Sequence, residues 1–406
     1  VLISLFIVTS ICGQVPQKIF YSNVSIFPSD SLSSVYYSYM IGYKNLVFET
    51  GKGLYNAEFN VSLEITDFKS SSITRYYDSK IIEVKTYDET IDARKRLQGV
   101  LNFSLPDGKY LFSTIISDKN SGKELKPRPD TVIVKSESIC QPIVSSNSIE
   151  CDALKYPEFV NLGGNIPFTE KTIDLIIPVT SLDCDSIKVS INNDGTVLYQ
   201  SVIRDKFISA LGFKLCNESI IVKTFDDSVK TLNFIVKNIN EKLPEGNIKI
   251  SVEAGSEKQV FNKNVEWLNK PVSLSDAEAA IKSLEFIEEG DAIKKMLDND
   301  EVKYPEVLRE YWNKYNPTPS TAFNPLMNEY YQRIDYSAKN FKPIGKLDGI
   351  KTDRAKIYIK YGKPVNIERH SNGIGKVVET WYYEKPTRKF IFVDKDGIGN
   401  YILQNG

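Results

Sequence analysis

Residues 347–364, LDGIKTDRAKIYIKYGKP, carry the signals for local structure that decide the C-terminal fold. Ala355 and every second residue to Tyr361 are apolar and alternate with polar residues as in a strand, although residues 354, 357, 358 and 361 also line one face of a helix. Thr352 can cap a helix through its hydroxyl, and Asp353 places negative charge at the positive end of the helix dipole. Gly362 suits the left-handed position after a helix, and the proline that follows cannot continue one. These flanks predict a helix over Asp353–Tyr361.

This segment resembles the signature of the GWxTD-domain family of bacterial envelope proteins. Ile350 stands where that motif has its tryptophan. The similarity extends over about the last third of the chain, through Trp312, NPTP at 316–319, NEYY at 328–331, YGKP at 361–364, WYY at 381–383 and FIFVD at 390–394. The resemblance implies an exported location and an architecture. The family has no assigned activity, so no catalytic residue is carried over from it.

The length of 406 residues suggests about three domains. A hydrophobic content of 41% is sufficient for packed cores. The 51 basic and 52 acidic residues give a net charge of −1. A general nucleic-acid surface needs a basic excess or a basic stripe, and the sequence has neither. We therefore expect no nucleic-acid partner.

The first 14 residues, VLISLFIVTSICGQ, form an apolar run of signal-peptide length that ends in small residues. The run lacks a basic segment and an initiator Met, as a truncated start would. We predict a signal peptide at 1–13, cleaved near Gly13, and export to the periplasm or the outer membrane. A buried N-terminal strand is one alternative. Lipidation of Cys12 is another, and it is the one route to membrane association that we predict.

Apart from Cys12, the sequence has an even number of cysteines, which favours disulfides in an exported chain. They are Cys140, Cys151, Cys184 and Cys216. We predict the pairs Cys140–Cys151 and Cys184–Cys216, which is one of three possible connectivities; four buried thiols are the alternative. No pair has close CxxC spacing and the chain has one histidine, so we expect no zinc site, no other metal and no cofactor.

The fold class that the sequence predicts is multidomain and mainly β. Short strand signals recur over Ile19–Val134, most clearly at Tyr55–Ile65, and again over Phe159–Leu268. Their spacing predicts two immunoglobulin-like β-sandwiches, at 18–138 and 150–270. Residues 140–157 have little periodicity and are predicted to be a junction.

After Pro271 the apolar period changes to that of helices. We predict a helical segment at 272–342, opened by a capping box of Ser275 with Glu278 and with Asn324 capping its last helix. The remaining residues, 343–406, are predicted to form a small α+β domain with an antiparallel sheet. Its strands are expected at 365–369, 377–384, 388–394 and 398–403.

Few residues of the sequence point to catalysis. His370 is the single histidine and precedes an Asn-Gly turn, so we expect it to be exposed in a hairpin. Asp394 begins a segment, DKDG, that resembles part of a calcium loop, but the later glutamate is missing and a hairpin turn is predicted. Paired carboxylates could hydrolyse glycans, and the pairs to consider are Glu329 with Asp335 and Asp353 with Glu379.

A structural role for these charges is the competing hypothesis, in which arginines clamp the last long helix onto the C-terminal domain. We expect an exported, non-enzymatic envelope protein that acts as a scaffold or binding module for a protein or a cell-wall polymer. A carboxylate-dependent glycan hydrolase is the alternative function. The predicted binding residues are Trp312, Glu329, Arg333, Asp353, Arg354 and Trp381.

Overall fold

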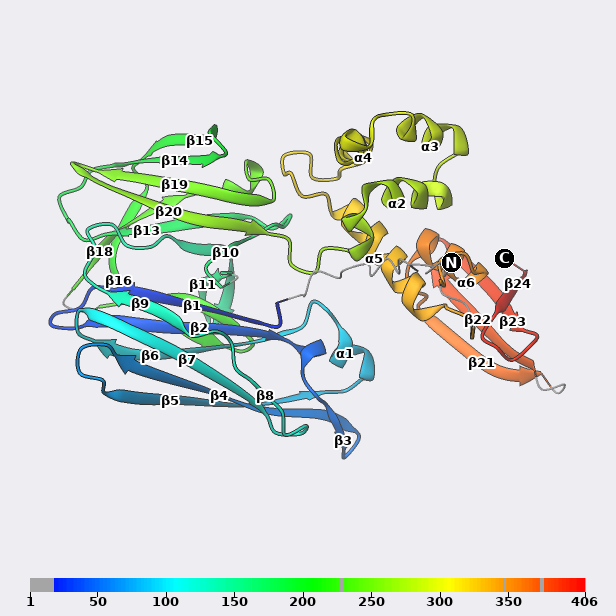
Figure 1. Cartoon of the computed structure of the whole chain (residues 1–406), viewed down its shortest axis with the longest axis horizontal. Helices are drawn as coiled ribbons and strands as arrows, with labels where there is room; N and C mark the ends of the chain where they lie inside the picture. The colour runs from blue at the N-terminus through cyan, green and yellow to red at the C-terminus, as the bar shows by residue number, and fades with distance from the viewer. Residues whose placement is uncertain (1–17, 162, 227–228, 346–347, 373–375, 406) are drawn as a thin grey trace, which may run out of the picture. The chain divides into compact units, whose positions relative to one another are not determined.

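The computed structural model describes residues 18–161, 163–226, 229–345, 348–372 and 376–405. The chain divides into two compact units, one that ends at Leu268 and one that begins at Asn269, and strands predominate as predicted (Figure 1). The predicted signal peptide at 1–13 and Cys12 lie outside the described residues. No helix within the described ranges combines the length and the apolar character that crossing a membrane requires.

The first β region contains two antiparallel sheets around one core. One sheet has the order β1 (Phe20–Phe27), β2 (Ser33–Gly42), β6 (Arg96–Leu105). The other has the order β3 (Glu49–Gly51), β4 (Leu54–Asp67), β7 (Gly108–Asp118), β8 (Glu124–Leu125), with β5 (Ile73–Val84) on β4 and β9 (Asp130–Val134) on β7. The alternation predicted for Tyr55–Ile65 is confirmed, because Phe59, Val61 and Leu63 are all buried in this core.

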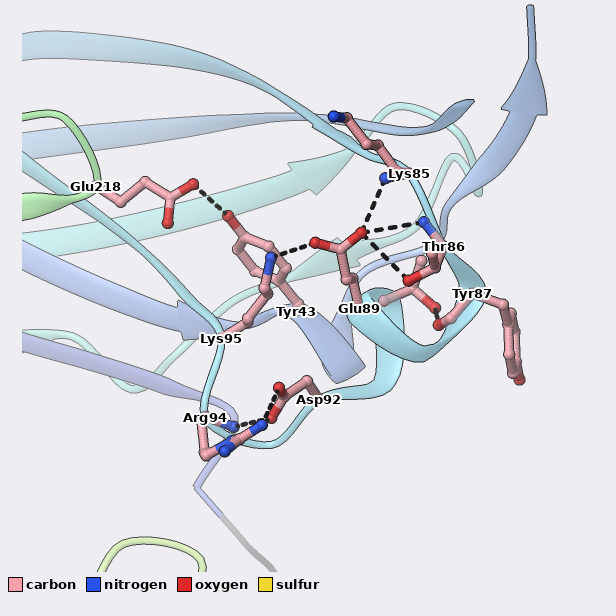
Figure 2. Close-up of polar contacts among 10 residues, drawn as sticks. Tyr43, Lys85, Thr86, Tyr87, Glu89, Asp92, Arg94, Lys95 and Glu218 are labelled. Atoms are coloured by element: carbon pink, nitrogen blue, oxygen red, sulfur yellow. Dashed lines mark hydrogen bonds and ion pairs between the residues drawn. The ribbon is translucent and has the colours of Figure 1, made fainter. Parts of the chain in front are cut away.

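A short helix, α1 (Tyr87–Ile91), follows β5 and is fixed by one carboxylate (Figure 2). Glu89 Oε2 accepts hydrogen bonds from the backbone amides of Thr86 at 3.0 Å and Lys85 at 2.9 Å, and Oε1 pairs with Lys95 Nζ at 2.7 Å. The Lys95 ammonium and the two amides lower the pKa of Glu89 to about 2. The end of β5 and the start of the chain segment toward β6 are therefore joined by this side chain.

The stability contribution of Glu89 should depend on pH. Its pKa is lower in the folded chain than in the unfolded chain, so the contribution is complete above about pH 4.5 and is lost as the pH falls through about 2. Thermal melts of the wild type and Glu89→Gln should differ at pH 6 and converge near pH 2. Glu58→Gln, at an exposed glutamate, should melt like the wild type throughout; equal melts for Glu89→Gln at pH 6 would contradict the assignment.

The second β region combines a closed barrel with an open sheet. The barrel runs β10 (Ile143–Cys151), β11 (Leu154–Phe159), β17 (Ser219–Phe225), β16 (Lys206–Cys216), β18 (Thr231–Val236), β13 (Ile173–Val179). The five-stranded sheet runs β12 (Ile166–Pro167), β20 (Glu257–Glu266), β19 (Gly246–Ala254), β14 (Ile187–Asn193), β15 (Thr196–Ile203). One apolar core joins the barrel to this sheet. The structure therefore confirms strands here but not the predicted immunoglobulin topology.

The predicted junction at 140–157 is wrong, because these residues form the hairpin of β10 and β11. Asp152 and Ala153 both have positive φ, as a tight hairpin turn requires. The pattern was hidden by Ser145 and Ser146, which are buried and donate to backbone oxygens at 3.4 and 2.8 Å. Serines satisfied in this way can line a strand without the hydrophobic alternation on which the prediction depended.

The two β regions share a further apolar cluster. Phe27 and Tyr36 of the first region contact Phe213 of the barrel, with ring centroids 5.6 and 5.4 Å apart. The predicted sandwiches therefore pack as one unit and are not independent modules.

The predicted disulfide pairing is wrong. Cys151, at the end of β10, is bonded to Cys216, at the end of β16, with 6.1 Å between their Cα atoms. Cys140 is a buried free thiol, and burial raises its pKa to about 12. Cys184 is also free, and its thiol donates to the Ser186 carbonyl at 3.3 Å. The barrel brings the ends of two hairpins together, whereas the prediction joined cysteines that are neighbours in sequence.

The second unit contains the helices and the sheet predicted after Pro271. The helices are α2 (Ala277–Lys282), α3 (Gly290–Leu297), α4 (Tyr304–Asn313), α5 (Pro325–Asn340) and α6 (Asp353–Tyr361). The sheet is an antiparallel meander of β21 (Asn366–Asn372), β22 (Lys376–Glu384), β23 (Thr387–Asp394) and β24 (Tyr401–Asn405). Asn324 caps α5 as predicted. The predicted capping box is wrong, because Asp276 and not Ser275 accepts from the first turn of α2, at Ala279 N.

Helix α6 has the predicted bounds, and a glycine sets where it begins. Thr352 Oγ1 accepts from Ala355 N at 3.2 Å and donates to the Gly349 carbonyl at 2.8 Å. A Cβ at Gly349 would lie 2.5 Å from the carbonyl oxygen of Ser337 and 2.7 Å from the amide of Lys342, both at the end of α5. The backbone before α6 therefore lies against the end of α5 at a distance that only glycine allows.

Gly349→Ala should destabilise the second unit by roughly 1–3 kcal/mol, because backbone atoms must move to admit the methyl group. Gly290→Ala is the matched control, since a Cβ there meets nothing within 4 Å. Calorimetry of the full chain should show a lower transition for Gly349→Ala and an unchanged one for Gly290→Ala. Equal melting of both variants would show that the close approach does not constrain the fold.

Candidate functional site

The structure places the predicted charged residues of the second unit within its fold. Asp353 Oδ2 accepts from Leu403 N of β24 at 3.0 Å, and Oδ1 pairs with Lys356 at 3.1 Å. Arg333 on α5 donates to the carbonyl of Ile359 at 3.1 Å and forms an ion pair with Glu329. As the structural hypothesis predicted, an arginine of α5 therefore binds the carboxyl end of α6.

Arg354 is buried between two aromatic rings. Its guanidinium carbon lies 3.9 Å from the ring centroid of Tyr401 and 5.0 Å from that of Phe341. One terminal nitrogen, Nη1, donates to Glu379 Oε2 at 3.3 Å, and the other donates to the carbonyl of Gly399 at 3.3 Å. The planar cation is thus held by stacking and by hydrogen bonds at once.

Glu379 lies in β22 with 1% of its surface exposed and is the anion of this cluster. Besides Arg354, it accepts from Arg369 Nε at 2.9 Å on Oε1 and from Trp381 Nε1 at 3.2 Å on Oε2. The hydrogen bond to Glu379 raises the pKa of Arg369. Two cations and an indole surround one carboxylate, so its negative charge is fully partnered inside the fold.

Both predicted tryptophans belong to the core. Trp312 is 2% exposed and donates from Nε1 to the Tyr331 hydroxyl at 3.4 Å, and Trp381 is 1% exposed. Arg354 is also buried. The predicted binding residues Trp312, Arg354 and Trp381 therefore cannot contact a partner while the domain is folded. Helical spacing correctly placed Trp312 on an apolar face, but it could not show that the core covers this face.

The acids proposed for glycan hydrolysis do not form an open pair. Asp335 Oδ2 and Oδ1 accept from Val272 N at 2.6 Å and Ser273 N at 3.0 Å. Glu329, Asp353 and Glu379 are held by the cations and amides described above. Glu329 is exposed and pairs with Arg333, whereas Asp335, Asp353 and Glu379 are bound by backbone amides or by side chains of neighbouring elements.

The exposure predicted for His370 is confirmed, and the hairpin predicted at Asp394 connects β23 to β24. His370 is exposed on β21, next to the described end of that strand. Asp394 accepts hydrogen bonds from the amides of Gly397 at 3.0 Å and Gly399 at 2.9 Å, which closes the loop between β23 and β24. No group of three or more metal-ligating side chains occurs within the described ranges.

Residues 254–404 match the GWxTD domain. This part of the chain is a GWxTD domain. Ile350, which replaces the motif tryptophan, packs against the core of the second unit, so an apolar side chain is kept at this position. No curated protein matches the chain.

A cavity in the first unit contains a charged group that the sequence analysis missed. It has a volume of about 350 Å³ and lies between β1, the segment after β9, and β20. Lys263 of β20 lines it and has the same parity as the core residues Phe261 and Val265, so it faces inward. Burial lowers the pKa of Lys263 to about 8. No described residue forms a hydrogen bond or ion pair with its ammonium group.

The other charges at this cavity cancel each other. Lys135 and Glu137 line it and form an ion pair at 2.7 Å, which leaves Lys263 as its unbalanced charge. Val24, Ile26 and the partly exposed Val260 supply an apolar wall. The sequence could have indicated this lysine, because Lys263 alternates with Phe261 and Val265 and so falls on the inner face of the strand.

Removing Arg354 should be costly because it leaves the carboxylate of Glu379 buried with fewer donors. We expect Arg354→Met to reduce the stability of the second unit by about 3–5 kcal/mol. Lys356→Met, which removes an exposed ion pair two residues further along α6, should cost less than about 1 kcal/mol. Urea unfolding of the full chain would measure both, and similar losses for the two variants would contradict the role of Arg354.

Proposed function

We propose that the chain is an exported, non-enzymatic envelope protein that serves as a scaffold and binds a protein or cell-wall polymer. Two features support this proposal. The polar side chains of the GWxTD domain that resembled a catalytic set, such as Glu379 and Asp335, are bound within the fold. The Cys151–Cys216 disulfide is a feature of proteins in oxidising compartments.

The first β region is proposed to be immunoglobulin-like, the fold from which many extracellular binding modules are built. Two antiparallel sheets enclose its core, and the hydroxyl of Tyr110 near the start of β7 donates to the carbonyl of Pro106 at 2.9 Å. A tyrosine that binds the backbone a few residues upstream is a recurrent corner of such sandwiches. This likeness supports a binding role without identifying a ligand.

The observation that carries the binding proposal is Lys263, a half-buried cation that lines a cavity and has no partner among the described residues. Partial desolvation of an ammonium group is costly unless the group is paired, and the one acid among the residues that line this cavity, Glu137, is already paired with Lys135. A carboxylate from a partner would supply that anion. The apolar wall beside Lys263 favours a carboxylate on an apolar chain, as at an acidic side chain of a protein flanked by aliphatic residues.

Hexanoate is a suitable probe because it combines these two properties. We expect it to bind near pH 8 with the uptake of about 0.5 proton, since a bound carboxylate raises the pKa of a half-protonated Lys263. Isothermal titration in two buffers with different ionisation enthalpies measures this uptake. Lys263→Met should lose binding by about tenfold or more.

Two controls separate the charge from the cavity. Lys258→Met changes an exposed lysine on the same strand, paired with Glu253 at 2.8 Å, and should bind hexanoate like the wild type. Hexanamide has the same shape without the charge and should bind at least tenfold more weakly. Equal affinity for hexanoate in the wild type and Lys263→Met, or the absence of any binding to the wild type, would contradict a carboxylate site.

A further inference from the structure

Strand β5 is a long edge of its sheet. Twelve residues, Ile73 to Val84, pair with β4, and no described strand pairs with the other side of β5. The outer side therefore presents a row of unpaired backbone amides and carbonyls, to which another strand can add. On the outward face Ile73, Tyr77 and Ile81 are 53%, 68% and 70% exposed, so this edge also carries apolar surface.

The charged residues of β5 alternate in sign along the strand. They are Arg75, Asp78, Lys80 and Glu83. Positions 75 and 83, and likewise 78 and 80, are equally distant from Ser79 and have opposite charge. When a strand pairs antiparallel with its own copy about Ser79, each charge therefore lies opposite its complement.

We infer that β5 is a self-association edge, at which two copies of the chain pair their β5 strands antiparallel with Ser79 opposite Ser79. Arg75 then faces Glu83 of the second copy, and Asp78 faces Lys80. Tyr77 faces Ile81 on the outward side, which is an aromatic and β-branched pair of the kind that stabilises sheets. By symmetry each of these contacts is made twice.

The charges also fix the register. A two-fold axis perpendicular to the combined sheet passes through one residue of β5, because residues that face each other must lie on the same face. Moving the axis by one residue sets Asp78 against Asp78, or Lys80 against Lys80. Both shifts place like charges directly opposite, which destabilises a sheet.

Edge strands often carry charges that prevent pairing with another strand. The ion pairs that β5 forms within its own chain must therefore be compatible with a dimer. Arg75 pairs with Glu64 of β4 at 2.8 Å, and Asp78 pairs with Lys80 at 3.1 Å. The side chains of Arg75 and Glu64 are both partly exposed. The carboxylate of Glu83 has no partner among the described residues, so it can pair with Arg75 of the second copy. A strand selected only against pairing would not need charges that complement its own reversed sequence.

A cysteine at the symmetry axis gives a direct test. In the predicted register the Cα atoms at position 79 are about 4.5–5.5 Å apart, within the range that a disulfide spans. Ser79→Cys should therefore form a covalent dimer under mild oxidation of the full chain, mapped to position 79 by mass spectrometry. Tyr77→Cys is the matched control on the same face, because its own copy would lie about 13 Å away along the partner strand.

Charge reversal tests the register independently. Glu83→Arg places like charges together at two symmetric positions and should weaken the dimer by about tenfold in sedimentation velocity. Adding Arg75→Glu restores complementarity and should restore the dimer. Failure of this rescue, crosslinking of Tyr77→Cys as readily as Ser79→Cys, or a wild type that remains monomeric at about 1 mM would each overturn the proposal.

Discussion

A single buried carboxylate joins three elements of the second unit. Glu379 sits inside the sheet, and a charge in that position is tolerated only when donors surround it. The donors come from three elements: Arg354 lies on α6, Arg369 on β21, and Trp381 on β22 together with Glu379 itself. The helix, the first strand and the second strand must therefore meet at one point. The aromatic rings that enclose Arg354 complete the packing around it.

The motif at the start of α6 also holds this helix against α5 and β24. Gly349 permits the backbone to lie against the end of α5, Thr352 caps the helix, and Asp353 accepts from the final strand. Gly349 is required for steric clearance. Thr352 is required to accept a hydrogen bond from a free amide in the first turn of the helix, and Asp353 accepts one from an amide of β24. A signature that looks like a binding motif is thus explained by three contacts internal to the domain.

Local chemistry explains which predictions the structure confirms. The bounds of α6 and the cap of α5 depend on residues within a few positions of each other, and both could be predicted from sequence. The disulfide and the hairpin of β10 depend on strand order and on buried serines, which sequence periodicity does not report. Exposure was the hardest property to predict, because Trp312 lies on an apolar stripe whether a partner or the core covers it.

The two units differ in what their folds leave unsatisfied. In the second unit the buried charge of Glu379 is bound by Arg354, Arg369 and Trp381, so these side chains are engaged within the fold. In the first unit the inward ammonium of Lys263 and the outer edge of β5 are left without partners among the described residues. Unpaired charge and unpaired backbone both cost free energy in a folded chain, and association is the process that recovers it. The groups without described partners therefore lie in the first unit, whereas Glu379 of the second unit is bound by Arg354, Arg369 and Trp381.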